Sequence, residues 1–343
     1  MKLPADKVAQ LRSFYDGRPV CVTGGAGFIG GHLVDALVSL GATVAVLDDL
    51  SNSTLEHLAG LIELEPQRVR FVHGSVLDDQ AMDDAAAGAS VIFHLGAIGS
   101  VPRSMSEPQR VWSVNATGTV RVLEAARRAR AQRVMLAASS SAYGDLPGAT
   151  PESQLRPKHE GIVPRPLSPY AASKLAAENA LAAWSAAYGL STVSLRYFNI
   201  FGPRQSADSA YAAVVAAFAS KLLKGEAPVI FGDGTQSRDF TYVANAVLAT
   251  LLSGASPAPL MGDVLNVATG RRVTVLELAQ VMAERCGEPH LRPQLLAERP
   301  GDVKHSLADL TRVREVLGFE PVATLEEGLG ETIAWYREAM ASR

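Results

Sequence analysis

The sequence has few of the features that mark disulfide-rich, membrane-spanning or nucleic-acid-binding proteins. Its 343 residues include only two cysteines, Cys21 and Cys286, far apart and outside any metal-ligand motif, so neither a disulfide framework nor a metal site is predicted. The net charge is −3 and no block of Lys and Arg occurs, which argues against a nucleic-acid or membrane-surface partner. The longest apolar stretch, residues 209–223, is too short to cross a bilayer and contains Lys221.

The composition predicts a globular protein with a substantial core. Hydrophobic residues make up 48% of the chain and charged residues 20%, a balance that does not suit a disordered protein. Residues 1–19 carry charges throughout and lack the apolar core of a signal peptide. We therefore expect a cytoplasmic location.

Short β-branched runs alternate with helical patterns through the first two hundred residues. These runs are continuously apolar, as in strands that are covered on both faces. We expect strands at 19–24, 43–48, 68–74, 90–97, 133–140 and 191–200, and helices at 30–41, 114–130 and from Ser168 onward. The alternation predicts an α/β fold with a doubly wound parallel sheet.

Beyond residue 200 the pattern changes. Loops rich in Gly, Pro and Asp, such as "FGDGTQSRD" and "ERPGDVKHS", separate shorter elements. We interpret this part as a smaller C-terminal lobe that closes over the carboxyl edge of the sheet, where open α/β folds bind ligands. The expected domains are residues 1–198, joined by a returning segment near 240–268, and residues 199–343.

A glycine-rich loop, "TGGAGFIG" (23–30), follows the first strand and opens the first helix. Gly24, Gly27 and Gly30 permit the tight turn and the close approach of a pyrophosphate that a Rossmann-type dinucleotide site needs. Asp48 ends the second strand, where a carboxylate can bind the ribose hydroxyls of NAD and repel the 2′-phosphate of NADP. No Lys or Arg lies between Gly30 and Arg68, so NAD is favoured; the alternative is that Asp48 merely caps a turn.

The segment "SPYAASK" (168–174) places Tyr170 and Lys174 on one face of a helix that begins at Ser168. A Tyr and a Lys at this spacing are common on ordinary helix surfaces. Beside a dinucleotide, however, the Lys174 ammonium and the nicotinamide charge would favour the phenolate of Tyr170, which could then act as a base. Ser139, Ser140 and Ser141 follow the fifth strand and could hold the substrate oxygen; a plain loop is the alternative.

Together these motifs resemble the extended short-chain dehydrogenase/reductase family, and within it the UDP-sugar 4-epimerases, closest to the UDP-N-acetylglucosamine 4-epimerase group. The resemblance extends from "VTGGAGFIG" to about residue 319. It implies an NAD-dependent enzyme in which Ser139 is the catalytic hydroxyl, assisted by Ser140, with Tyr170 as the base and Lys174 as its partner.

The resemblance also implies binding residues for the cofactor and the UDP-sugar. The cofactor set is Gly24, Gly27, Phe28, Ile29, Gly30, Asp48, Asn52, Ser53, Ser75, Val76, Leu95, Ala97, Asn115, Tyr170 and Lys174. The substrate set is Ser100, Arg103, Ser141, Asn199, Phe231, Arg238, Arg299, Asp302 and Ser306. Ser75 departs from the acid that the family often has at its position. The arginine fork suits a diphosphate on independent grounds.

Several questions stay open at this level. Ser140 and Ser141 stand where related sugar dehydratases have acids, which favours epimerisation at one carbon. A UDP-glucuronate 4-epimerase is the main alternative, followed by a 4,6-dehydratase or a non-catalytic NAD-sensing module. Ser306 either leaves room for an acetamido group or caps the following helix. The family commonly forms homodimers through the segments near 105–130 and 170–188, and the stretch 151–166 has no assigned role.

Overall fold

The computed structural model describes residues 4–145, 155–207, 213–298 and 303–341. Its centre is a seven-stranded sheet in the order β11–β6–β5–β4–β1–β2–β3, in which every neighbouring pair is parallel. The strands are β1 (Pro19–Thr23), β2 (Thr43–Asp48), β3 (Val69–His73), β4 (Val91–His94), β5 (Arg133–Ser139), β6 (Ser191–Tyr197) and β11 (Met261–Val267). The predicted doubly wound parallel sheet is confirmed.

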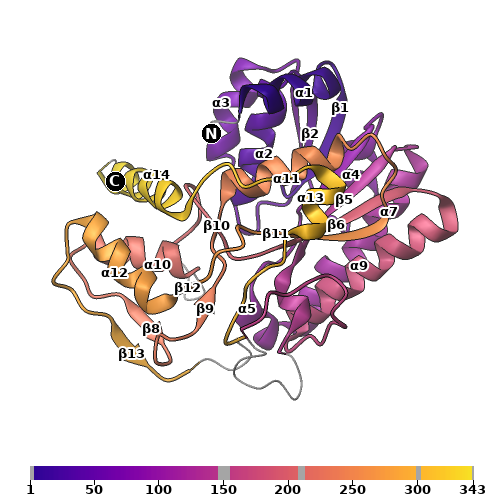
Figure 1. Ribbon diagram of the computed structural model, residues 1–343. Helices are drawn as coiled ribbons and strands as arrows, with labels where there is room; N and C mark the ends of the chain where they lie inside the picture. Colours follow the sequence, from indigo (N-terminus) through magenta and orange to yellow (C-terminus); the bar gives the residue numbers. More distant parts are fainter. Residues whose placement is uncertain (1–3, 146–154, 208–212, 299–302, 342–343) are drawn as a thin grey trace.

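Helices cover both faces of this sheet (Figure 1). On one face lie α2 (Phe28–Ser39) and α11 (Val243–Gly254), and on the other lie α4 (Asp79–Ala86), α7 (Gly118–Arg128) and α9 (Pro169–Tyr188). Because successive strand residues point to opposite faces, Val20 and Val22 pack in the first core and Cys21 packs in the second. Two buried faces explain why the strands are continuously apolar.

The other elements either lie beside the sheet or form the C-terminal lobe. Beside the sheet lie α1 (Ala5–Tyr15), α3 (Glu56–Leu64), α5 (Val101–Ser106), α6 (Pro108–Trp112), α13 (Thr311–Leu317) and the helical turns η1 (Ser113–Thr117) and η2 (Ser140–Tyr143). The lobe contains α10 (Val214–Leu222), α12 (Val275–Cys286) and α14 (Leu325–Ala341), together with the paired strands β8 (Val229–Phe231) and β13 (Gln294–Leu296). Two further short pairs, β7 (Ile200–Phe201) with β10 (Thr241–Tyr242) and β9 (Ser237–Arg238) with β12 (Val273–Thr274), lie between them.

The expected strand at 90–97 is shorter than predicted and spans only Val91–His94. Two further expected elements contain an irregularity. The expected helix at 114–130 opens with the π-helical turn η1, in which Asn115 hydrogen-bonds the backbone of Ile98. The expected strand at 191–200 ends at Tyr197, because Asn199 adopts φ +40° and breaks the strand before β7. Both irregularities lie beside the carboxyl edge of the sheet.

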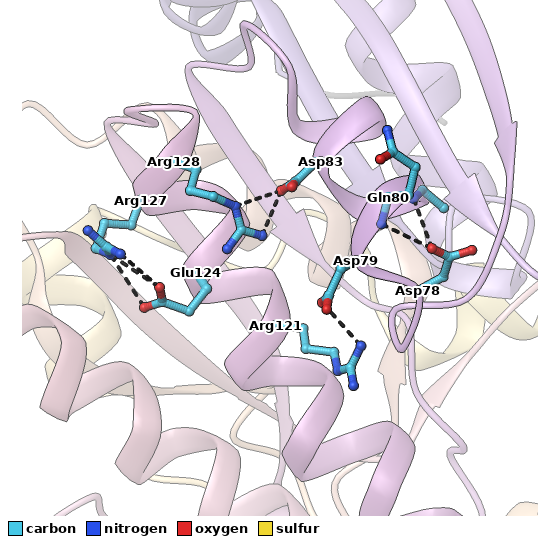
Figure 2. A network of polar contacts seen from close by, with 9 residues as sticks. Asp78, Asp79, Gln80, Asp83, Arg121, Glu124, Arg127 and Arg128 are labelled. Carbon is cyan, nitrogen blue, oxygen red and sulfur yellow. Dashed lines mark hydrogen bonds and ion pairs between the residues drawn. The ribbon is translucent and has the colours of Figure 1, made fainter.

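A polar network joins α4 to α7 on the outer surface (Figure 2). Asp79 pairs with Arg121 at 3.1 Å, and Asp83 pairs with Arg128 at 2.7 Å. These side chains are largely exposed, so each pair stabilises the fold by about 0–1 kcal/mol and the apolar contacts beneath them dominate. In the described part of the chain no helix is long and apolar enough to cross a membrane.

Candidate active site

A cavity of about 900 Å³ lies at the carboxyl edge of the sheet and is closed on one side by the C-terminal lobe. Most of the predicted site residues line it. They are Gly24, Gly27, Phe28, Ile29, Gly30, Asp48, Asn52, Ser53, Ser75, Val76, Leu95, Ala97, Ser139, Ser140, Ser141, Tyr170, Lys174, Asn199, Arg238 and Ser306. The fold therefore brings residues from across the chain to one surface.

The glycine loop is shaped by close backbone contacts. Gly24 adopts φ +70°, and a Cβ there would lie 2.6 Å from the backbone nitrogen of Gly96. A Cβ on Gly30 would collide with the carbonyl oxygen of Gly24. Gly27 precedes α2 without any side-chain cap, so the first N–H groups of this helix are available to an anion. This cradle fits the pyrophosphate of a dinucleotide.

Asp48 both fixes a turn and lines the cavity. Its Oδ1 accepts hydrogen bonds from the Leu50 N–H at 2.9 Å and the Ser53 hydroxyl at 3.0 Å, and its Oδ2 accepts from the Ala26 N–H at 3.0 Å. A carboxylate has about four acceptor positions, so these bonds orient Asp48 and leave capacity for a ribose hydroxyl. The turn-capping alternative and the cofactor site are thus compatible.

The three serines meet Tyr170 where β5 ends. Ser139 Oγ lies 2.8 Å from Ser141 Oγ and accepts a hydrogen bond from the Ser141 N–H, which caps η2. Tyr170 lies in the first turn of α9, which Ser168 caps through the Ala171 N–H. Burial raises the pKa of Tyr170, and a hydrogen bond with Ser139 partly offsets that effect.

Lys174 follows Tyr170 by one turn of α9 and contacts strand β5. Its Nζ donates a hydrogen bond to the carbonyl oxygen of Ala137 on β5 at 2.8 Å, and its side chain is buried. Burial lowers the pKa of Lys174 to about 8, although the nearby Glu178 carboxylate raises it. Burial and the Ser139 hydrogen bond govern the pKa of Tyr170 in this structure, and the combined action of Lys174 and the nicotinamide charge stays a prediction.

Four predicted binding residues lie outside the cavity lining. Ser100 accepts the Arg103 N–H and so caps α5, and Arg103 bonds Glu107 and the Asn52 side chain. Asn115 is buried behind the loop after β4, where it bonds Ile98 and Ser173. Phe231 ends β8 in the lobe. Two more, Arg299 and Asp302, lie outside the described residues.

The lobe side of the cavity presents Asn199, Arg238 and Ser306. Asn199 Nδ2 donates to the Asp239 carbonyl oxygen at 3.2 Å, and Arg238 Nη1 donates to the carbonyl oxygens of Ser237 and Lys304. These bonds hold a positive side chain in the cavity wall.

Ser306 does not cap the helix that follows it. Helix α13 begins only at Thr311. The Thr311 N–H donates a hydrogen bond to Asp309 Oδ1 at 2.8 Å. Ser306 is instead 7% exposed in the cavity wall, and its N–H bonds the Ser237 carbonyl oxygen. The capping alternative is wrong.

The lining also contains polar residues that were not predicted from the sequence, including Arg110, Lys158 and Gln205. Gln205 belongs to the motif "RYFNIFGPRQ" and could have been found there. Arg110 and Lys158 stand alone in their segments and carry no such signal. Among the described residues, no cluster of His, Cys, Asp and Glu could hold a metal ion.

Comparisons with known proteins agree with this geometry. A UDP-glucose 4-epimerase of Mycolicibacterium smegmatis is 38% identical over 317 residues, 92% of this chain and 97% of that protein. A dTDP-glucose 4,6-dehydratase of Streptomyces niveus is 34% identical over 334 residues, 94% of each chain. A solved UDP-N-acetylglucosamine 4-epimerase from Methanobrevibacter ruminantium M1, in complex with UDP-N-acetylmuramic acid, has a TM-score of 0.86 at 37% identity and covers 95% of this chain and 100% of its own.

The family model described as the NAD dependent epimerase/dehydratase family matches residues 20–268. That range contains the glycine loop, Asp48, the three serines and the Tyr170–Lys174 pair. Since the match spans most of the chain and the relatives extend over more than nine-tenths of it, this protein is an NAD-dependent enzyme and belongs to the NAD-dependent epimerase/dehydratase family of extended short-chain dehydrogenases/reductases.

Proposed function

We propose that this enzyme is a UDP-sugar 4-epimerase that interconverts UDP-N-acetylglucosamine and UDP-N-acetylgalactosamine. The observation that carries the proposal is the distribution of carboxylates. Among the described residues that line the cavity, the carboxylates are Asp48 and Asp49, both at the end of β2, and serines occupy the turn beside Tyr170. Elimination of water from a sugar needs an acid beside the reacting carbons, whereas epimerisation does not.

Epimerisation at C4 consists of oxidation of the C4 hydroxyl to a ketone and reduction from the opposite face. In the proposed mechanism Tyr170 accepts the hydroxyl proton, and Ser139 holds the same oxygen. The bond between Ser139 and Ser141 fixes the direction of that donor. Bound NAD supplies the hydride acceptor, and its nicotinamide charge opposes the burial that raises the pKa of Tyr170.

The choice of an N-acetylated sugar depends on Ser306. A small hydroxyl side chain in the cavity wall leaves more volume than an aromatic residue would, and an acetamido group needs that volume. The similarity to the Methanobrevibacter UDP-N-acetylglucosamine 4-epimerase supports the same choice. UDP-glucose and UDP-galactose are smaller, and we propose them as secondary substrates.

Incubation of the purified enzyme with a panel of UDP-sugars tests the proposal. The panel contains UDP-N-acetylglucosamine, UDP-N-acetylgalactosamine, UDP-glucose and UDP-glucuronate, with products resolved by NMR. We expect the C4 epimer of each acetylated sugar and the highest kcat/KM for those two. A 4-keto-6-deoxy product would instead assign a dehydratase, and turnover of UDP-glucuronate alone would reject the acetylated substrates.

Three further expectations belong to this proposal. We propose a homodimer that forms through the segments near 105–130 and 170–188, which light scattering of the purified protein tests. The domain boundaries at 1–198 and 199–343, with the returning segment near 240–268, are testable by limited proteolysis. The cytoplasmic location is testable by fractionation of the source cells.

A further inference from the structure

Lys158 is a buried cation in the cavity wall that the proposed reaction does not use. Its side chain belongs to the stretch 151–166, for which the sequence indicates no role. The residue is 4% exposed, yet it lines the cavity together with Ser141, Arg238 and Ser306. A charged side chain in this position needs an explanation, because burial of an ammonium is costly unless it is paired.

The backbone of Lys158 is held from several directions. Its N–H donates to the Leu307 carbonyl oxygen at 2.8 Å, and its carbonyl oxygen accepts from the Asp309 N–H at 3.0 Å and from Asn266 Nδ2 at 2.8 Å. This bridge attaches Lys158 beside the segment that carries Ser306. The position of the side chain is therefore set by the fold and not by a freely moving loop.

The ammonium has donors to spare. Nζ donates to the carbonyl oxygen of Gly144 at 2.8 Å, and the ring of Tyr143 lies 5.9 Å away. An ammonium carries three donors, and the bond to Gly144 uses one of them. Burial lowers the pKa of Lys158 to about 8; the Asp145 charge raises it and the Arg238 charge lowers it. Lys158 is thus mainly protonated at neutral pH and faces a cavity.

We propose that Lys158 is a substrate-binding residue whose ammonium binds an oxyanion of the substrate. This inference rests on the proposed function, since it assumes that the cavity binds a nucleotide sugar. The oxyanion has two chemical sources: a carboxylate on the sugar ring or the diphosphate of the nucleotide. Lys158 bonds Gly144, which directly follows the turn η2 that Ser139 caps and that contains Ser141. The ammonium therefore lies near the end of the cavity that we assign to the sugar.

The test compares three ligands that separate these sources. UDP-N-acetylglucosamine and its 6-carboxylate counterpart differ by one negative charge on the sugar, and UDP has the diphosphate without a sugar. KM for the two sugars and the calorimetric Kd of all three are measured for the wild type, Lys158→Met and the control Lys304→Met. Lys304 is an exposed cation whose carbonyl oxygen bonds the cavity residue Arg238, and its removal reports general electrostatic attraction.

We expect Lys158→Met to raise the Kd of at least one ligand by about tenfold or more, because that is the effect of losing a hydrogen bond to a charged group. If only the 6-carboxylate sugar nucleotide binds more weakly, Lys158 contacts the sugar carboxylate. If all three ligands bind equally more weakly, Lys158 contacts the diphosphate. Unchanged KM and Kd in a folded variant, a loss in kcat alone, or the same loss in Lys304→Met would overturn the proposal.

Two further measurements keep the test decisive. Lys158→Gln, which keeps a polar side chain, replaces Lys158→Met if the latter loses bound NAD or its cooperative melting transition. Absence of turnover by the wild type would reject the proposed function, whereas the calorimetric Kd values would still test Lys158 in that case.

Discussion

At the scale of single residues, the central feature is the environment of Tyr170. Burial raises its pKa, and its hydrogen bond with Ser139 offsets only part of that effect. Lys174 shares its helix face and bonds Ala137, and the nicotinamide charge of a bound cofactor would further favour the phenolate. The proposed mechanism therefore couples the action of Tyr170 as a base to cofactor binding.

Replacing Tyr170 with Phe removes the phenolic oxygen and leaves the ring. We expect kcat to fall by about 10²–10⁴-fold, because that is what a positioned general base contributes, while the Kd for NAD⁺ stays nearly unchanged. Single-turnover kinetics and calorimetry measure the two effects. A Tyr170→Phe enzyme with normal kcat would require a different base.

Replacing Ser306 with Tyr fills the part of the cavity wall that we assign to the acetamido group. Overpacking costs about 1–3 kcal/mol, which corresponds to about 5- to 150-fold in kcat/KM against the acetylated sugars relative to UDP-glucose. Measurement of kcat/KM for both sugar types gives the ratio. If the ratio does not change, Ser306 does not select the substrate.

At the scale of elements, helix α9 and strand β6 are joined beside the active site by a buried ion pair. Arg196 Nη2 and Nε bond the Glu178 carboxylate at 2.7 and 3.0 Å, and both side chains are 3% exposed. Glu178 lies one turn after Lys174 and raises its pKa. The pair therefore links the packing of two elements to the charge of Lys174, a proposed catalytic residue.

Glu178→Gln should affect stability and pH dependence together. Without the Glu178 charge the pKa of Lys174 falls below its value of about 8. Lys174 then loses its proton at lower pH, so the alkaline decline in kcat moves to lower pH. Loss of one partner of a buried pair lowers the free energy of unfolding by about 3–5 kcal/mol. The control Asp83→Asn breaks the exposed pair with Arg128 and should change stability by less than about 1 kcal/mol without moving the pH profile (Figure 2). An unshifted pH profile of kcat in Glu178→Gln would show that the ion pair does not influence catalysis.

Elements and motifs differ in how far the sequence predicts them. The apolar strands, the glycine loop and the Ser168 cap are local patterns, so the sheet and the position of Tyr170 could be predicted. Lys158 could not, because its place depends on a bridge to Ala308, 150 residues away. The bond from Lys174 to Ala137 is likewise tertiary, and helix spacing alone suggested a different partner.

At the scale of the whole molecule, a stability measurement tests the cofactor preference. NAD⁺ at 100 times its Kd should stabilise the apoenzyme by about 2.7 kcal/mol, because it binds only the folded state. NADP⁺ at the same concentration should stabilise it less. Its 2′-phosphate meets the Asp48 carboxylate, and residues 31–67 contain no Lys or Arg to neutralise it. Thermal melts of the apoenzyme with each cofactor give the comparison, and Asp48→Asn should narrow the gap, since the asparagine has no charge to repel the phosphate. Equal stabilisation of the wild type by both cofactors would show that Asp48 does not discriminate between them.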